Sequence, residues 1–260
     1  MTSDLDALDR QRRRWRRARR AMHLDDVADP QFAAGGLGAR VQQLTCRVVI
    51  LPSDPERHLI DFDDAFWEAW MSVSSPFNGR QLQWGSQTTT TTTAGARSDR
   101  AGENLWDRYA AVHHSGALDL GMGRACGWRG EHNGWTGCTY LVPVVATVWE
   151  SCHVHLRLAE RYGFDLPWEL SIAIPQTHGT VLGRFGEGWA EPESWDYHPE
   201  QCPESGLLFR REVNAPTDDW PQATAFSIGV QLENAFGSTS QRFRKFKNHV
   251  LGDFDLSRYR

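Results

Sequence analysis

The sequence predicts an α+β fold, in which a mixed, mainly antiparallel sheet is packed by two long helices and one shorter helix and carries basic tails. Two observations lead to this prediction. Short runs rich in β-branched and aromatic residues are separated by turn residues, and three other segments place apolar residues at helical spacing. The chain has 260 residues, 40% of them hydrophobic and 23% charged, so it is long enough to bury a sizeable core.

The first folded segment is expected between residues 42 and 85. Its residues 44–51 are rich in β-branched side chains and stop before Pro52, which predicts a strand. Residues 62–73 place aromatic rings at helical spacing, which predicts a helix with Asp61 as its N-cap. We expect these rings to lie in the core and not to form a ligand cage; they belong to Phe66, Trp67 and Trp70.

Residues 86–102 contain six consecutive threonines and show neither alternation nor a helical period. We expect a Thr-rich loop here. We also expect the segments before and after it to share one continuous sheet, because a piece of about 40 residues is too small to be stable alone. The domain is therefore predicted to span residues 42–237, between a basic tail at 1–41, disordered or helical, and a basic, aromatic tail at 238–260.

The second folded segment combines further strands with two long helices. The first helix is predicted at residues 143–162, with Pro143 in its first turn and Gly163 just after its end. The second is predicted at 218–236 on the same proline and glycine pattern. The sequence His114-Ser115-Gly116 predicts a hairpin turn. Strands are predicted at residues 106–113, 117–122, 168–174, 180–185 and 207–213.

Cysteine number and hydropathy indicate the compartment. The five cysteines are odd in number and none are paired as CxxC, which favours reduced thiols in a cytoplasm. No apolar run approaches the roughly 20 residues needed to span a bilayer, and the N-terminus lacks the apolar region of a signal peptide. We therefore expect a cytoplasmic protein without a membrane partner.

The charge of the chain is segregated. Residues 10–20 carry eight arginines and no acid, so the rest of the chain has a net charge of −13 within a total of −5. Guanidinium groups bind phosphate through paired hydrogen bonds, and aromatic rings between them can stack on bases. The residues expected to contact nucleic acid are Arg12, Arg13, Arg14, Trp15, Arg16, Arg17, Arg19, Arg20, Arg242, Arg244, Lys245 and Lys247.

Familiar catalytic motifs are missing from the sequence. It contains no GxxxxGK[ST], no GxGxxG after a strand and no GxSxG, so no nucleotide cofactor and no serine nucleophile are predicted. No metal site is predicted either. His153 and His155 lie about 200° apart around a helix, as surface or boundary residues, and Cys152 falls in the apolar stripe of that helix.

One arrangement keeps catalysis open as an alternative. The hairpin turn and the Gly-rich loop that follows it carry imidazole and carboxylate groups that could act as general bases. A metal-dependent hydrolase, of the nuclease or phosphodiesterase type, would use them. The residues concerned are His113, His114, Glu131 and His132.

Several runs resemble a known bacterial family. They are YAAVHHSGALDLGMG, VVATVWESCHVHLRLAERYGF, ELSIAIPQTHGTVLG and REVNAPTDDWPQATAFSIGVQLENAFG, within residues 103–237. Their order resembles the accessory region that follows the divergent AlbA-like domain, related to Schlafens, in bacterial putative DNA-binding proteins. The EFK and Gly-Gly-strand signatures of the AlbA-like domain itself are absent. The resemblance implies a regulatory or interaction module near nucleic acid, with no catalytic residue to carry over and no nuclease activity.

Together these observations predict a non-enzymatic binding or regulatory module of a bacterial cytoplasm, which contacts nucleic acid through its Arg-rich N-terminal tail and also binds a protein partner. The metal-dependent hydrolase is one alternative. A structural component of a multiprotein assembly is the other.

Overall fold

The computed structural model describes residue 13 and residues 46–54, 57–74, 88–91, 95–101, 106–122, 137–175, 177–183, 197–237, 247–248 and 253–254. Its elements in chain order are β1 (Cys46–Leu51), α4 (Asp64–Ser72), β2 (Thr88–Thr91), β3 (Gly95–Ala101), β4 (Trp106–His113), β5 (Leu118–Met122), β6 (Gly137–Tyr140), α5 (Leu141–Tyr162), β7 (Trp168–Pro175), β8 (Thr180–Gly183), β9 (Tyr197–Gln201), β10 (Gly206–Val213), α6 (Trp220–Ala235), β11 (Lys247–Asn248) and β12 (Asp253–Phe254). The predicted α+β class, with two long helices and one shorter helix, is confirmed.

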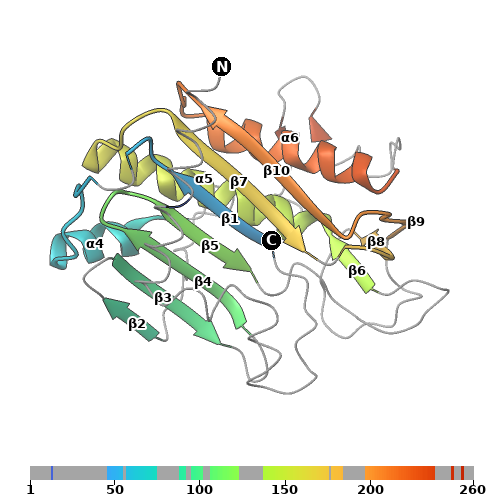
Figure 1. Cartoon of the computed structure of the whole chain (residues 1–260), viewed down its shortest axis with the longest axis horizontal. Coiled ribbons are helices and arrows are strands. Elements are labelled where there is room, and N and C mark those ends of the chain that lie inside the picture. Colours follow the sequence, from blue (N-terminus) through green and yellow to red (C-terminus); the bar gives the residue numbers. More distant parts are fainter. Residues whose placement is uncertain are drawn as a thin grey trace.

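A seven-stranded sheet forms the body of the described part of the chain, in the order β10-β7-β1-β5-β4-β3-β2. All of its neighbouring strands are antiparallel. Figure 1 shows α5 and α6 together on one face of this sheet. Because β1 lies between β5 and β7, the segments on either side of the threonine run belong to one sheet.

The threonine run corrects one prediction. The segment 86–102, expected as a loop, contains β2 and β3, which pair with each other and extend the sheet beyond β4. A homopolymer cannot alternate, so the absence of a period-2 pattern carried no information here. The β-branched side chain of threonine itself favours extended backbone, and this preference prevails.

The helix α5 follows its predicted pattern closely, although it begins two residues earlier, at Leu141. Its buried stripe includes Val145, Val148 and Cys152. The predicted end is confirmed, because Gly163 has a left-handed backbone with φ 68° and its N–H donates to the carbonyl oxygen of Ala159 at 2.8 Å. The other long helix, α6, carries its proline in the first turn, as predicted.

The short helix α4 begins two residues later than its expected cap requires. Asp63, and not Asp61, is the N-cap, and its side chain accepts a hydrogen bond from the backbone N–H of Phe66 at 2.9 Å. Asp61 instead accepts from the imidazole of His58 at 2.9 Å. The predicted core position of the aromatic face is confirmed, since Phe66 and Trp70 are buried and Trp67 packs against them.

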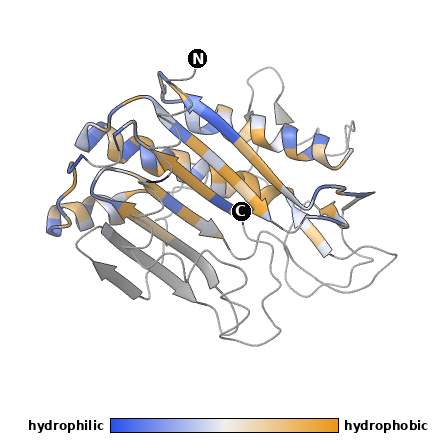
Figure 2. Ribbon diagram, in the orientation of Figure 1, coloured by the Kyte–Doolittle hydropathy of each residue, from blue (hydrophilic) through white to orange (hydrophobic). Residues whose placement is uncertain are grey.

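The core lies between the central strands and α5. On one face of the sheet, Val48 and Ile50 of β1 stand opposite Leu120 and Leu118 of β5, and all four side chains are fully buried. Figure 2 shows long hydrophobic stretches along β1 and α5. In the described part of the chain no helix is long and apolar enough to cross a membrane.

A second, three-stranded sheet with the order β6-β8-β9 lies at one end of the molecule (Figure 1). Its β6 and β8 are parallel, so the parallel pairing lies in this second sheet, whereas the seven-stranded sheet, predicted as mixed, is antiparallel throughout. The strands β6 and β9 were not predicted. Both are short, and β6 directly precedes α5 without an intervening turn that would have marked it.

The predicted β4–β5 hairpin is confirmed, and its turn packs tightly against the end of α5. Gly116 has a left-handed φ of 83°, and a Cβ atom placed on it would lie 2.6 Å from ring atoms of Phe164. We expect Gly116→Ala to lower the free energy of unfolding by about 2–3 kcal/mol, through backbone strain and overpacking. Urea denaturation followed by circular dichroism measures this change.

A matched control separates the two causes of that loss. Gly163 also has a positive φ, of 68°, but a Cβ atom there would meet nothing within 4 Å. Gly163→Ala therefore carries only the backbone cost of roughly 1 kcal/mol. Equal losses for the two variants would contradict the close packing of the turn on Phe164.

Candidate functional site

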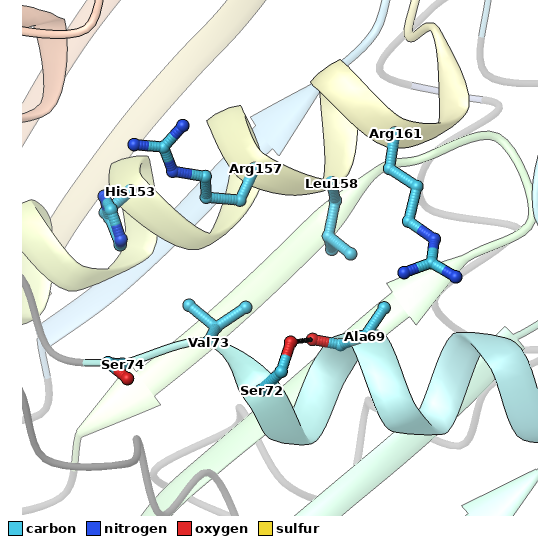
Figure 3. Close-up of a pocket in the computed structure, with 8 residues that line it drawn as sticks. All are labelled: Ala69, Ser72, Val73, Ser74, His153, Arg157, Leu158 and Arg161. Carbon is cyan, nitrogen blue, oxygen red and sulfur yellow. Dashed lines mark hydrogen bonds between the residues drawn. The ribbon is translucent and has the colours of Figure 1, made fainter.

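A groove lies between the last turn of α4 and the second half of α5, with a volume of about 240 Å³ (Figure 3). The α5 wall combines basic and apolar side chains, and the α4 wall combines hydroxyl and apolar side chains. The lining residues are Ala69, Ser72, Val73, Ser74, His153, Arg157, Leu158 and Arg161. We call this set the α4–α5 groove.

The sequence of α5 sets the basic wall. His153, Arg157 and Arg161 are spaced by four residues, so they follow one another along a single face of the helix. The face toward the sheet is closed by buried residues such as Cys152 and Leu156. The three basic groups are therefore held in a row along the α4–α5 groove by a helix that the core fixes in place.

Each basic group of the row has its own setting. Arg157 donates to Glu160 at 2.8 Å, in an exposed pair that contributes little to stability. The guanidinium of Arg161 lies 5.8 Å from the ring centroid of Tyr162. Figure 3 shows Arg161 directed across the groove toward α4, whereas the guanidinium of Arg157 lies along α5 on the side of His153. Both arginines keep donors that a ligand can use.

The imidazole of the row is partly buried, which affects its charge. Burial lowers the pKa of His153, and the positive charge of Arg157 lowers it further, while Glu160 acts in the opposite direction. At neutral pH His153 is thus an uncharged hydrogen-bonding group. An anion in the groove would add a favourable charge beside it and raise this pKa.

The α4 wall supplies hydroxyl groups above an apolar floor. Ser72 donates to the carbonyl oxygen of Ala69 at 2.8 Å and so closes the last turn of the helix. Ser74 follows the helix on the same wall and is exposed. Val73 and Leu158 are buried and form the floor. None of the lining residues is acidic, so the α4–α5 groove is chemically suited to an anion.

The histidine turn is the second cluster, and it contains two residues of the predicted hydrolase site. The carbonyl oxygen of His114 accepts from the backbone N–H groups of Leu59 and Ile60, at 2.8 and 3.0 Å. The imidazole Nδ1 of His114 donates to the carbonyl oxygen of Ile60 at 2.6 Å. His58 stacks on His114, with ring centroids 4.1 Å apart. These contacts fasten the turn to the segment that leads into α4.

A serine–histidine contact in this turn is too deeply buried to act on a substrate. Ser115 Oγ lies 2.8 Å from His113 Nδ1, and this nitrogen also accepts from the backbone N–H of Ser115 at 3.2 Å. Ser115 is completely buried. Burial, together with the charges of His114 and His58, lowers the pKa of His113 to about 4. The contact closes the turn and presents no hydroxyl to a substrate.

The remaining predicted hydrolase residues, Glu131 and His132, lie outside the described residues. The structure therefore brings together His113 and His114, whose ring centroids are 6.1 Å apart, and leaves the other half of that prediction untested. Among the described residues no three His, Cys, Asp or Glu side chains are grouped so that they could hold a metal ion.

Most of the residues predicted to bind nucleic acid also lie outside the described residues. They are Arg12, Arg14, Trp15, Arg16, Arg17, Arg19, Arg20, Arg242, Arg244 and Lys245. Arg13 is described as an exposed, helical residue. Lys247 begins β11. Their role in binding stays a prediction.

The α5 helix confirms one prediction and corrects another. Cys152 lies in the core as expected, and among the described residues it is one of four buried cysteines that are free thiols, with Cys46, Cys138 and Cys202. His155, expected at the surface or boundary, is instead fully buried. Its ring packs edge-to-face on Trp168, with centroids 4.5 Å apart, because the apolar face of this helix is wider than the stripe predicted for it.

The α4–α5 groove is not among the sites predicted from the sequence. A local signal existed, because His153, Arg157 and Arg161 recur every four residues on a predicted helix. By itself, such a row of basic residues predicts a solvent-exposed helix face. The other wall of the groove comes from α4, which is far away in the sequence, so the groove could not be predicted from α5 alone.

Comparison with known proteins gives the chain no relative. No family model matches it. No curated protein and no solved structure matches it either, so the resemblance of residues 103–237 to the region after the divergent AlbA-like domain stays a prediction.

Proposed function

We propose that this chain is a nucleic-acid-binding module of a bacterial cytoplasm, which acts by binding and not by catalysis. The observation that carries the proposal is the row of His153, Arg157 and Arg161 in a groove without an acidic lining residue. Guanidinium groups present a planar fork of donors that matches phosphate oxygens.

The distribution of charge supports the same proposal. A chain with a net charge of −5 repels nucleic acid unless its positive charge is concentrated. Residues 10–20 concentrate eight arginines, and the α4–α5 groove adds a second basic site on the folded body. The tail would supply salt-dependent affinity, and the groove would position a phosphate group.

The N-terminal arginines provide the first test. Replacing Arg12–Arg14, Arg16, Arg17, Arg19 and Arg20 by glutamine is expected to weaken binding to a labelled single strand and to flatten its salt dependence. Each phosphate contact that is lost reduces the slope of log K against log salt by about 0.7 for single strands. Fluorescence anisotropy over a salt series measures both quantities, with DNA and RNA as separate probes.

Two further variants complete this experiment. Arg157→Gln/Arg161→Gln is expected to weaken binding of a phosphorylated strand, whereas Arg210→Gln is not. Arg210 is an exposed arginine of β10 on the face of the sheet that faces away from the helices, so it controls for a general loss of charge. Unchanged affinity and salt slope in the tail variant would refute the proposed role of the arginines.

A further inference from the structure

The α4–α5 groove is bounded on two sides, which distinguishes it from an open basic surface. Arg161 reaches over it from α5 toward α4, and Val73 and Leu158 form its buried floor (Figure 3). Its volume is about 240 Å³. This space is large enough for a phosphate group.

The hydrogen-bond donors of the groove come from both walls. The α5 wall offers the guanidinium of Arg161, which is directed toward α4, and the imidazole of His153 (Figure 3). The α4 wall offers the hydroxyl of Ser74, because Ser72 already donates to Ala69. A ligand that accepts from both walls needs several oxygens directed to different sides. A phosphate with three terminal oxygens satisfies this condition better than one with two.

We propose that the α4–α5 groove binds a phosphomonoester, namely the terminal phosphate of a nucleic-acid strand. This inference rests on the proposed function and names the part of the strand that the groove recognises. The chain then binds a strand at two places, with the end of the strand in the groove and its internal phosphates on the arginine-rich segment.

The charge of the groove favours a terminal phosphate over an internal one. A phosphomonoester carries about −1.5 to −2 charges at pH 7, whereas each internal phosphate carries one. Arg161 supplies a positive charge in the groove, and Arg157, whose guanidinium lies along α5 and is paired with Glu160, adds a partly offset charge at its edge. A dianion therefore gains more from this setting than a monoanion does.

The test compares single strands of one sequence that end in a 5′-phosphate, a 3′-phosphate or hydroxyl groups only. We expect wild-type protein to bind one of the phosphorylated strands about tenfold more tightly than the hydroxyl-ended strand, the effect of one charge-assisted contact. Arg161→Gln is expected to abolish this preference, with a larger loss of affinity for the phosphorylated strand than for the hydroxyl-ended strand. Anisotropy at constant salt measures all three affinities.

The controls separate the inference from the proposed function. Arg210→Gln should keep the preference, and Ser74→Ala should reduce it through a second, exposed residue of the groove. Circular dichroism verifies the fold of each variant. Equal wild-type affinity for all three strands overturns the inference and leaves the proposed function standing, as does an equal loss for all strands in Arg161→Gln.

A free mononucleotide distinguishes the two sources of the same phosphate chemistry. If a nucleoside monophosphate displaces the phosphorylated strand only at a large excess, the strand end is the ligand, as proposed. If the mononucleotide binds in an Arg161-dependent manner and no strand binds, the groove is a nucleotide site. That result overturns both the strand-end assignment and the proposed function.

Discussion

Arg47→Met is expected to lower the free energy of unfolding by about 3–5 kcal/mol, because it leaves the charge of Asp119 buried without its main partner. Arg47 donates to both carboxylate oxygens of Asp119, from Nε at 2.9 Å and from Nη2 at 2.5 Å. The side chain of Asp119 is fully buried, and that of Arg47 is 23% exposed. A loss of this size is a large part of the 5–15 kcal/mol that stabilises a typical domain.

The strand register explains why this pair forms. In the β1–β5 ladder, Arg47 stands opposite Gly121, and Asp119 stands opposite Val49, so the two charged residues are diagonal neighbours. They lie on the face of the sheet opposite to Val48 and Ile50. Gly121 has no side chain, which leaves the guanidinium room to reach the carboxylate.

The chain offers a matched control for this prediction. Arg57 makes two 2.6 Å contacts with Asp165, but the two side chains are 51% and 33% exposed. Arg57→Met should therefore cost less than about 1 kcal/mol. The double variant Arg47→Met/Asp119→Leu should recover much of the stability that Arg47→Met loses, since no buried charge remains. Urea denaturation measures all three, and equal losses for the two single variants would rule out this account.

Local sequence signals predicted the parts of the fold that local chemistry determines. Gly163 ends α5 because only a left-handed residue closes that helix as observed, and the alternation of β7 follows from its one buried face. The turn at Gly116 belongs to the same class. The N-cap of α4 was missed by two residues, because Asp61 and Asp63 carry the same side chain and only the fold decides between them.

Features that depend on distant residues were not predictable. Arg47 and Asp119 are separated by 72 positions, and nothing near either residue indicates that they form a pair. The α4–α5 groove depends in the same way on α4 packing beside α5. The prediction of function was limited for a different reason. An arginine-rich segment indicates a polyanionic ligand, but it does not indicate which residues of the folded domain contact that ligand.

The second large predicted effect is a loss of folding stability at acidic pH, and it is caused by His155. Its ring is fully buried between Trp168 and Phe164, and neither nitrogen has a hydrogen-bond partner among the described residues. Burial lowers the pKa of His155 to about 3. The folded protein therefore keeps this imidazole neutral at pH values where an unfolded chain, with an ordinary pKa of about 6.5, binds a proton.

This difference makes stability fall with acidity over a defined range. Above about pH 6.5 neither state protonates the ring, and His155 adds no pH dependence. Between about pH 6.5 and 3 only the unfolded state binds the proton, so His155 lowers the free energy of unfolding by about 1.4 kcal/mol per pH unit. His113, whose pKa is lowered to about 4, acts in the same direction above pH 4.

His155→Leu is expected to reduce by one the number of protons that the protein takes up on unfolding in acid. It is also expected to stabilise the protein at neutral pH. Leucine fills a similar space and leaves no unsatisfied ring nitrogen, a change of about 1–3 kcal/mol in favour of the folded state. Denaturation between pH 4.5 and 7.5 should show a shallower slope than wild type. Val154→Ala, a neighbouring core change without a titrating group, should lower stability and keep the wild-type slope. An unaltered slope in His155→Leu would mean that the ring is already protonated, or reached by water, in the folded chain.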